Sequence, residues 1–309
     1  MLTSGLRFVF LLALTTCGLS AGAQQQEATH AERFADPHAR AEQADREATA
    51  TLARVPDNVD ALVARARARL QLGKQQESLA DFERAAALDP ARVDVRAQLA
   101  LAHAGAGRFA EVKVAADTAL ALDPQNPAAH YALGLLLLAA TTDLQSAVKH
   151  LERASAASPA APEVRFDLLR AFARQGDRAR AAVQLRMLGV LLPPSDARIL
   201  HGQGLLAALQ GRLDAAVAKF REAAQAKPEL PAAPIEGALA IARALALKGK
   251  SDQAVALFEE ATRRFPQSVE AHLELAGALE KAGRADEARA ARQRVQDLVR
   301  ELGVEAAQP

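Results

Sequence analysis

The sequence predicts an all-α protein built as an array of stacked helix pairs. Half of its 309 residues are apolar, with no Trp and one Tyr, and the excess of Ala and Leu over β-branched and aromatic residues favours helices over strands. A helix-like phrase that closes on proline, FERAAALDP at 82–90, returns as ADTALALDP, LERASAASP, LRMLGVLLP, FREAAQAKP and FEEATRRFP. Such a recurring phrase is typical of an internal repeat.

The first 23 residues have the pattern of a secretory signal peptide. Arg7 precedes the apolar run FVFLLAL, and Ala21-Gly22-Ala23 is a small-residue cleavage pattern. The alternative is a bacterial lipoprotein signal in which Cys17, the only Cys, becomes the acylated first residue of the mature chain, although Thr16 departs from the small residue usual before that Cys. We expect an exported protein, periplasmic or, in the alternative, lipid-anchored to the outer membrane.

Two segments precede the array. Residues 24–36, QQQEATHAERFAD, are polar and are predicted to form a flexible leader. Residues 37–55 have a helical pattern, with Ala44, Ala48 and Leu52 on one face, in the place of the second helix of a missing repeat. We expect this helix to cap the first complete pair.

The closing prolines measure the repeat. Their spacings are close to 34 residues throughout, apart from one longer unit that ends at Pro266; the prolines are Pro56, Pro90, Pro124, Pro159, Pro193, Pro228 and Pro266. Glycines keep step with them at 73, 107, 176, 211, 249 and 283. Each glycine is expected to end the first helix of a pair in the left-handed conformation, and each proline to end the second.

This pattern resembles the tetratricopeptide repeat family, whose unit has 34 residues and whose second half reads A-x3-F and then P. Ala216, Phe220 and Pro228 match that half, as do Ala254, Phe258 and Pro266, while no repeat has the Trp of the first half. The resemblance covers residues 57–300, about seven repeats. It implies a right-handed superhelical solenoid in which each repeat is stabilised chiefly by its neighbours.

Two regions depart from the regular unit. Arg292 takes the position held elsewhere by Phe or Leu, so we expect the last helix to be a polar C-terminal cap, with residues 301–309 as a loose tail. The long unit carries four extra residues between Pro228 and Gly249. They predict either a first helix longer by one turn or a longer entry loop in which Pro231 and Pro234 suit a helix start.

No pattern of catalytic or cofactor chemistry is found. The sequence has no glycine-lysine nucleotide loop, no H-E-x-x-H and no cysteine pair, so we expect no enzyme, no cofactor and no metal. The formal charge is +1, and loss of Arg7 with the signal peptide would reduce it to zero, so no global charge directs the chain to nucleic acid. His130 and His272 stand where the family has Trp, which predicts a packing role.

The family geometry implies a concave groove lined by the first helix of each pair. Its apolar, aromatic and arginine positions form the candidate site for a partner peptide or helix, since aromatic and Arg side chains dominate binding energy at interfaces. The candidate residues are Arg67, Leu101, Tyr131, Leu135, Leu138, Phe166, Arg170, Arg174, His201, Leu205 and Arg243.

Two functions remain open from the sequence. The first is a non-enzymatic scaffold of the bacterial cell envelope that binds a protein or peptide partner in the groove, with Arg170 and Arg174 pairing a carboxylate. The second is a structural or self-associating component, as a homo-oligomer, of an envelope assembly for secretion, pili, outer-membrane proteins or polysaccharide export. There the outer face and residues 229–248 would matter more than the groove.

Overall fold

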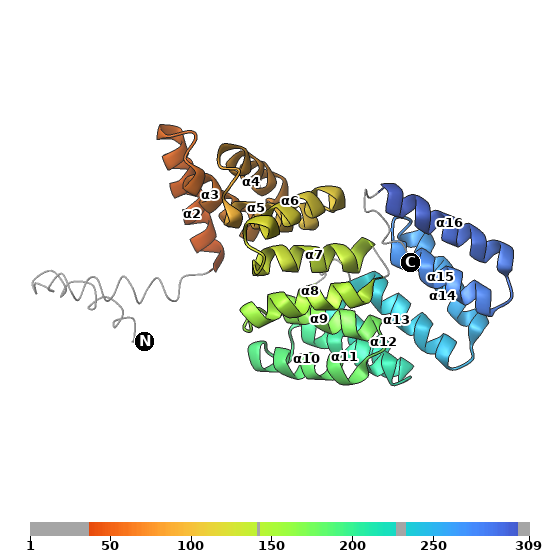
Figure 1. Ribbon diagram of the computed structural model, residues 1–309. Coiled ribbons are helices and arrows are strands. Elements are labelled where there is room, and N and C mark those ends of the chain that lie inside the picture. Colours follow the sequence, from red (N-terminus) through yellow and green to blue (C-terminus); the bar gives the residue numbers. More distant parts are fainter. Residues whose placement is uncertain (1–36, 141–142, 227–232, 302–309) are drawn as a thin grey trace, which may run out of the picture.

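The computed structural model describes residues 37–140, 143–226 and 233–301, and within these ranges it contains fifteen α-helices and no strand (Figure 1). The predicted all-α repeat array is therefore confirmed. The expected signal peptide, Cys17, the leader 24–36 and residues 302–309 of the expected tail lie outside the described residues.

The helices follow one another as antiparallel pairs after a single helix, α2 (Pro37–Arg54). The first helices of the pairs, here called A helices, are α3 (Val59–Gln71), α5 (Val93–Gly105), α7 (Pro127–Ala140), α9 (Pro162–Arg174), α11 (Ala197–Leu209), α13 (Ala233–Leu247) and α15 (Val269–Lys281). The second, here called B helices, are α4 (Gln75–Leu88), α6 (Phe109–Leu122), α8 (Leu144–Ala157), α10 (Arg178–Leu191), α12 (Leu213–Ala226), α14 (Ser251–Arg264) and α16 (Ala285–Glu301).

Glycine ends six of the seven A helices, as predicted. The φ angle of these glycines lies between 69° and 76°, a left-handed conformation that a residue with a Cβ adopts only with strain. At Gly73 the next N–H, that of Lys74, donates to the carbonyl of Arg69 at 2.8 Å and closes the helix end. In the remaining pair Asp143 caps α8, because its side chain accepts from the Ser146 N–H at 2.9 Å.

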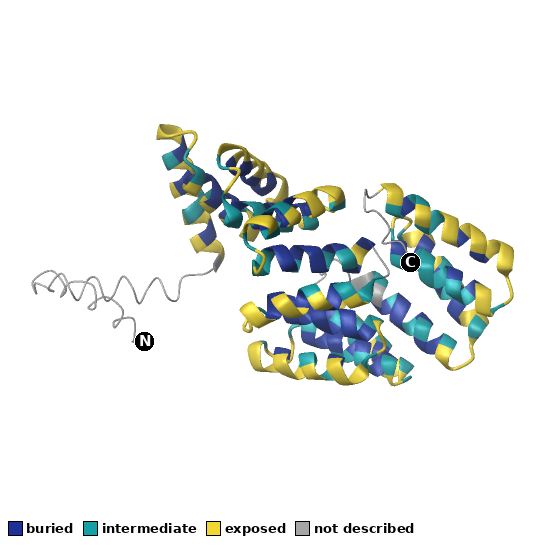
Figure 2. Ribbon diagram, in the orientation of Figure 1, coloured by how far each residue is buried: buried dark blue, intermediate teal, exposed yellow. Residues whose placement is uncertain are grey.

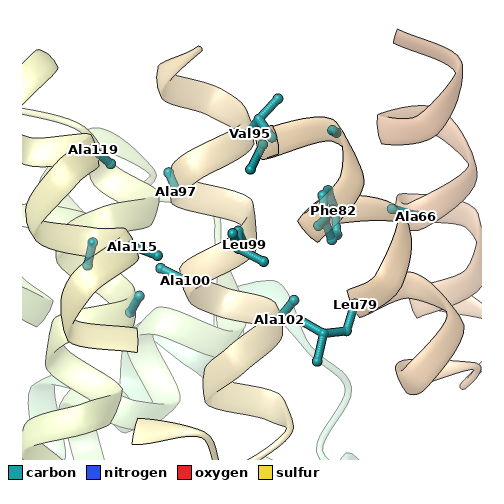
Figure 3. Close-up of a cluster of buried hydrophobic side chains, with 14 of the residues drawn as sticks. Ala66, Leu79, Phe82, Val95, Ala97, Leu99, Ala100, Ala102, Ala115 and Ala119 are labelled. Atoms are coloured by element: carbon teal, nitrogen blue, oxygen red, sulfur yellow. The ribbon is translucent and has the colours of Figure 1, made fainter. Parts of the chain in front are cut away.

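The core follows the repeat. The alanines that let paired helices approach, Ala147, Ala181, Ala216 and Ala254, are fully buried. One turn later Phe82, Leu151 and Phe258 are also buried, and Figure 3 shows Phe82 among the apolar side chains of the first pairs. Because each cluster joins neighbouring pairs, the core runs along the array instead of forming one central mass.

Phe220 is an exception to the expected core position. Its side chain is only half-buried, although its ring lies against Gly204 and Gly237 and 5.1 Å from the His201 ring.

The two ends of the array are held by different interactions. Asp45 of α2 accepts from Arg69 at 3.1 Å and Lys74 at 3.3 Å, and Arg69 also binds Asp81 at 2.9 Å. Burial raises the pKa of Asp45, but hydrogen bonds from Lys74 and Arg69 outweigh it and lower that pKa below its usual value. This network fixes α2 on the first pair.

At the C-terminal end, Arg292 of α16 lies on the exposed side of the helix and pairs with Glu280 at 2.7 Å. Arg289, Arg294 and Arg300 pair with Asp286, Glu301 and Asp297. The basic residues of this helix therefore form surface ion pairs, which add little stability but give the outer side a polar character.

The four extra residues of the long unit are shared between helix and connection. α13 has 15 residues, against 13 in α11, and the residues before it, 227–232, lie outside the described part. Pro234 stands in the first turn of α13, where its missing N–H costs no hydrogen bond.

The array curls back on itself. Figure 1 shows the last helices returning beside the middle of the chain, and α15 contacts α7 although three helix pairs lie between their own pairs along the chain. The A helices α7, α9, α13 and α15 thus face one another across the concave side.

Candidate functional site

A cleft of about 440 Å³ opens on the concave side between α7, α9, α13 and the turn that joins α14 to α15. This volume falls within the range of small-ligand pockets. We call it the inner cleft; it is lined by Leu138, Ala139, Arg170, Ile235, Arg264, Phe265, Pro266, Gln267, Ser268 and Glu270.

The turn between α14 and α15 forms one wall of the inner cleft. Pro266 follows α14 and prevents its continuation, and Ser268 begins α15 by accepting from the Ala271 N–H at 3.2 Å. The carbonyl of Pro266 is itself held by His272 Nε2 at 3.1 Å. Phe265 and Arg264 are thereby fixed at the rim, with the Arg264 guanidinium 5.7 Å from the Phe265 ring centroid.

An ion cluster lies beside the cleft and joins three A helices. Glu270 of α15 lies 2.9 Å from Arg174 Nε of α9 and also accepts from Arg243 of α13. Arg243 Nε donates to Glu274 at 2.8 Å. Burial lowers the pKa of Arg243, but Glu270 and Glu274 outweigh it and raise that pKa above its ordinary value, so the side chain stays charged.

A second polar chain crosses from α7 to α9. The Tyr131 hydroxyl donates to Asp167 Oδ2 at 2.7 Å, and Arg170 donates to the other carboxylate oxygen of Asp167. Burial and the nearby Asp167 carboxylate raise the pKa of Tyr131 above its usual value, so the hydroxyl remains a donor.

The arginines of α9 and α13 also border a much smaller space. A cavity of about 30 Å³ lies between α9, α11 and α13, with Arg170, Arg174, Leu205 and Arg243 in its wall. It has room for about one or two water molecules. The inner cleft is the larger of the two spaces and is therefore the candidate site.

The structure brings together most of the candidate residues from the middle of the chain. Tyr131, Leu138, Arg170, Arg174 and Arg243 lie in the inner cleft or in the polar groups beside it. Their side chains already bind other parts of the same chain; Arg174, for example, also donates to the Leu138 carbonyl.

Three candidates lie in the core. Phe166, His201 and Leu205 are buried, and the His201 ring stands 5.7 Å from Phe166. Leu135 is half-buried on α7. Arg67 and Leu101 belong to α3 and α5 and do not line the cleft; Arg67 is exposed, 3.8 Å from Asp94, and Leu101 packs on the N-terminal core.

Sequence reasoning missed the carboxylates and the turn. Asp167 and Glu274 occupy the same position in their repeats, eight residues after the closing proline, where the other repeats of regular length have Ala, Gln or His. An acidic residue at this position, close in sequence to Arg170 in one repeat, was the sequence feature that could have indicated these ion pairs. Arg264 and Phe265 gave none, because the end of a B helix is charged in several repeats.

The histidines at the Trp position have a polar role beside packing. His130 Nε2 lies 3.2 Å from the Pro124 carbonyl, as His272 does with Pro266. His130 Nδ1 also lies 2.9 Å from His150 Nδ1 of α8. In two other repeats an arginine makes the proline contact, Arg96 with Pro90 and Arg165 with Pro159, so this side chain anchors the entry to the A helix.

Within residues 37–140, 143–226 and 233–301, no helix combines the length and apolarity needed to cross a bilayer. In the same part of the chain, no three His, Cys, Asp or Glu side chains are grouped so that they could hold a metal ion.

No curated protein shows significant similarity to the sequence. Solved structures similar to it include a tetratricopeptide repeat protein from Parabacteroides merdae, 14% identical, with a TM-score of 0.45, covering 79% of this chain and 96% of that one. A TPR protein from Thermus thermophilus is 20% identical, with a TM-score of 0.46 and coverages of 59% and 98%. The pilF protein of Pseudomonas aeruginosa is 19% identical, with a TM-score of 0.45 and coverages of 72% and 97%.

The family model for the tetratricopeptide repeat matches residues 38–93, 179–231 and 239–300, more than half of the chain. The first match begins within α2, so the model includes this helix with the first pair. Solenoids of this kind present concave surfaces to protein partners. With its helix pairs, its left-handed glycines and these matches, the chain belongs to the tetratricopeptide repeat family.

Proposed function

We propose that this protein is a non-catalytic scaffold of the bacterial cell envelope that binds a short peptide segment of a partner in the inner cleft. The observation that carries the proposal is the cleft itself, which joins apolar walls to two arginines on the concave side. Such a lining suits a segment with an apolar side chain and a carboxylate.

Apolar burial supplies the binding energy in this proposal. Leu138, Ile235 and Phe265 come from three different helices or turns and form the apolar part of the lining. Burying an apolar side chain there would contribute about 25 cal/mol for each Å² removed from water.

Arg264 supplies the specificity for a carboxylate. Among the described residues it pairs with no acidic group, whereas Arg174 and Arg243 are bound by Glu270. The inner cleft has a volume of about 440 Å³, whereas a helix with its side chains is about 10 to 12 Å across, so an extended segment suits it better than a whole helix. The proposed ligand is therefore an extended peptide carrying Asp, Glu or a C-terminal carboxylate.

The envelope location rests on the first 23 residues, which have the pattern of a signal peptide. Cell fractionation with N-terminal sequencing of the recovered chain tests it. A mature chain that begins at Gln24 supports export, and acylation at Cys17 supports the lipid-anchored form. Full-length protein retained in the cytoplasm would contradict the proposed location.

A displayed library of short peptides tests the cleft. Peptides selected on the wild-type chain should bind Arg264→Ala at least about fivefold more weakly, the loss expected from removing a charged anchor. Arg263→Ala is the matched control, because Arg263 is exposed on the same helix but does not line the cleft. Selected peptides that bind both variants as well as wild type would reject the inner cleft as the site.

A further inference from the structure

The outer face of α10 is unusually apolar for this array. Val183, Met187, Val190 and Leu191 are 41%, 43%, 83% and 38% exposed, and Figure 2 shows α10 largely in the colour of exposed residues. Spacings of four, three and one residues place these four side chains on one side of the helix, where we call them the α10 stripe. Only Ala181 and Leu188 of this helix are buried.

The repeat does not require this stripe. At the position of Met187, six residues before the closing proline, the other B helices through α14 carry Arg84, Thr118, Arg153, Glu222 and Glu260. Val190 likewise replaces residues that are Ala, Gln or Arg elsewhere. On α6, Val114 and Leu122 are exposed at the positions of Val183 and Leu191, but Thr118 and Ala121 stand there at the positions of Met187 and Val190. Scattered exposed apolar residues of this kind need no explanation. A group of four on one helix indicates a surface that is covered by a partner.

Its shape suits one helix. From Val183 to Leu191 the stripe runs about 12 Å along the axis at about 1.5 Å per residue. Ala179, Val183, Met187 and Leu191 follow one another at intervals of four, which is the ridge that packs into the groove of a second helix.

The charge around the stripe is positive. α10 contains Arg178, Arg180 and Arg186 and no acidic residue. Arg180 is held by Asp177 at 2.5 Å and lies 4.5 Å from the Phe172 ring centroid, while Arg186 pairs with no acidic group in the described part of the chain. Two of these arginines stand in the first turn, where positive charge opposes the helix dipole. An acidic group on a partner would pair with Arg186, and its negative charge would also offset the positive charge of the first turn.

This charge distribution selects among possible occupants. A second copy docking through its own α10 would bring two sets of arginines together. An anionic bilayer is broader than one helix and would also approach Glu152 and Glu222, exposed on the B helices of the adjoining repeats. A single helix with acidic flanks matches both the width and the charge.

We propose that the outer face of α10 is a second docking surface, separate from the inner cleft, for an amphipathic helix that places apolar residues on the α10 stripe and acidic residues beside Arg186. The groove and this surface lie on opposite helices of the pairs. One chain can therefore hold two partners at once.

The test uses a labelled synthetic peptide designed as a helix with one leucine stripe flanked by glutamates, titrated against the full mature chain. A second peptide has lysine in place of every glutamate. We expect the glutamate peptide to bind at least about tenfold more tightly than the lysine peptide, and Met187→Glu to weaken it by about fivefold or more. Because Glu222 and Glu260 occupy the same repeat position, this variant is compatible with the fold.

Val114→Glu on α6 is the control, since Val114 is 69% exposed on another B helix and its loss should leave binding unchanged. Equal binding of both peptides, or equal loss in both variants, would overturn the proposal. So would binding to phosphatidylcholine–phosphatidylserine vesicles without binding to the peptide, which would make the occupant a membrane. Self-association that Met187→Glu abolishes, seen by light scattering, would make it a second copy.

Discussion

Glu270 of α15 lies 2.9 Å from Arg174 of α9, and this ion pair closes the concave side of the array. Both side chains are nearly buried, at 12% and 8% exposed, so water screens their attraction weakly. The same carboxylate accepts from Arg243. Three repeats thus share one acidic residue, which makes the curvature of the array depend on it.

Glu270→Gln should loosen this closure. The substitution keeps the shape of the side chain but removes its charge, and we expect a loss of about 2 kcal/mol in the free energy of unfolding together with a larger radius of gyration in small-angle scattering. Glu163→Gln is the control, because its 3.0 Å pair with Arg198 is 60% exposed on the Glu163 side and should contribute under about 1 kcal/mol. Equal effects of the two variants would contradict the closing role.

Replacing Phe258 and replacing Phe220 should cost different amounts of folding free energy. Phe258→Ala removes a side chain that is 2% exposed, and we expect it to lower the free energy of unfolding by about 3 to 5 kcal/mol. Phe220→Ala should cost less, because Phe220 is half-buried. Denaturant unfolding of both variants measures the difference. A larger loss at Phe220 would mean that its burial is greater than the structure indicates.

Gly204 is expected to tolerate no side chain. A Cβ there would lie 2.7 Å from the Phe220 ring, so Gly204→Ala must displace the ring and should be destabilising by about 1 to 3 kcal/mol. Gly277→Ala provides the opposite case, since a Cβ on this mid-helix glycine meets nothing within 4 Å. It should stabilise α15 by about 0.5 to 1 kcal/mol. Thermal melting of both variants would show shifts of opposite sign, and shifts of the same sign would contradict this packing.

Acid should destabilise the fold through histidines that are buried or half-buried. Burial lowers the pKa of His130 and His150 below the ordinary value of 6.5, and His150 is lowered further by His130. Because the unfolded chain then binds protons more readily, the stability they contribute is present above about pH 6.5 and is lost as the pH falls from there through the folded-state pKa values. His103 and His272 shift in the same direction.

Melting temperatures measured from about pH 8 down to pH 5 check this expectation. The variant His150→Gln removes one of the two titrating groups in the 2.9 Å contact between His130 and His150. Its melting temperature should therefore fall less steeply with acid than that of the wild type. An unchanged slope would assign the acid sensitivity to other groups.

Much of the fold was predictable because its information is local. Gly73 and its counterparts end helices through their own φ angle, Pro266 ends α14 by lacking an N–H, and Ala254 recurs wherever paired helices touch. Each of these effects acts within one repeat, and the residue responsible recurs in nearly every repeat. The 34-residue period of the sequence therefore identifies these residues. Phe220 was the exception, since its burial depends on the helix that follows the longest connection.

The candidate site was predictable only in part. The geometry implied by the family resemblance placed Tyr131, Arg170, Arg174 and Arg243 on the concave side, and the structure brings them close together. Their partners Asp167, Glu270 and Glu274 were missed. Glu270 stands in the first turn of α15, where an acidic residue is equally typical of a surface or capping group. Asp167 and Glu274 lie in the middle of α9 and α15, where an acidic residue is equally typical of a solvent-exposed face.

The sequence by itself determined the unit of this protein: its length, the helix ends and the residues packed between paired helices. Only the tertiary structure decided how tightly the units curl, and hence that Glu270 meets Arg174 and that Arg264 and Phe265 border the remaining cleft. The physical reason is that small rotations between successive pairs add up along the array. A contact between α7 and α15 depends on all of them, and no single repeat encodes it.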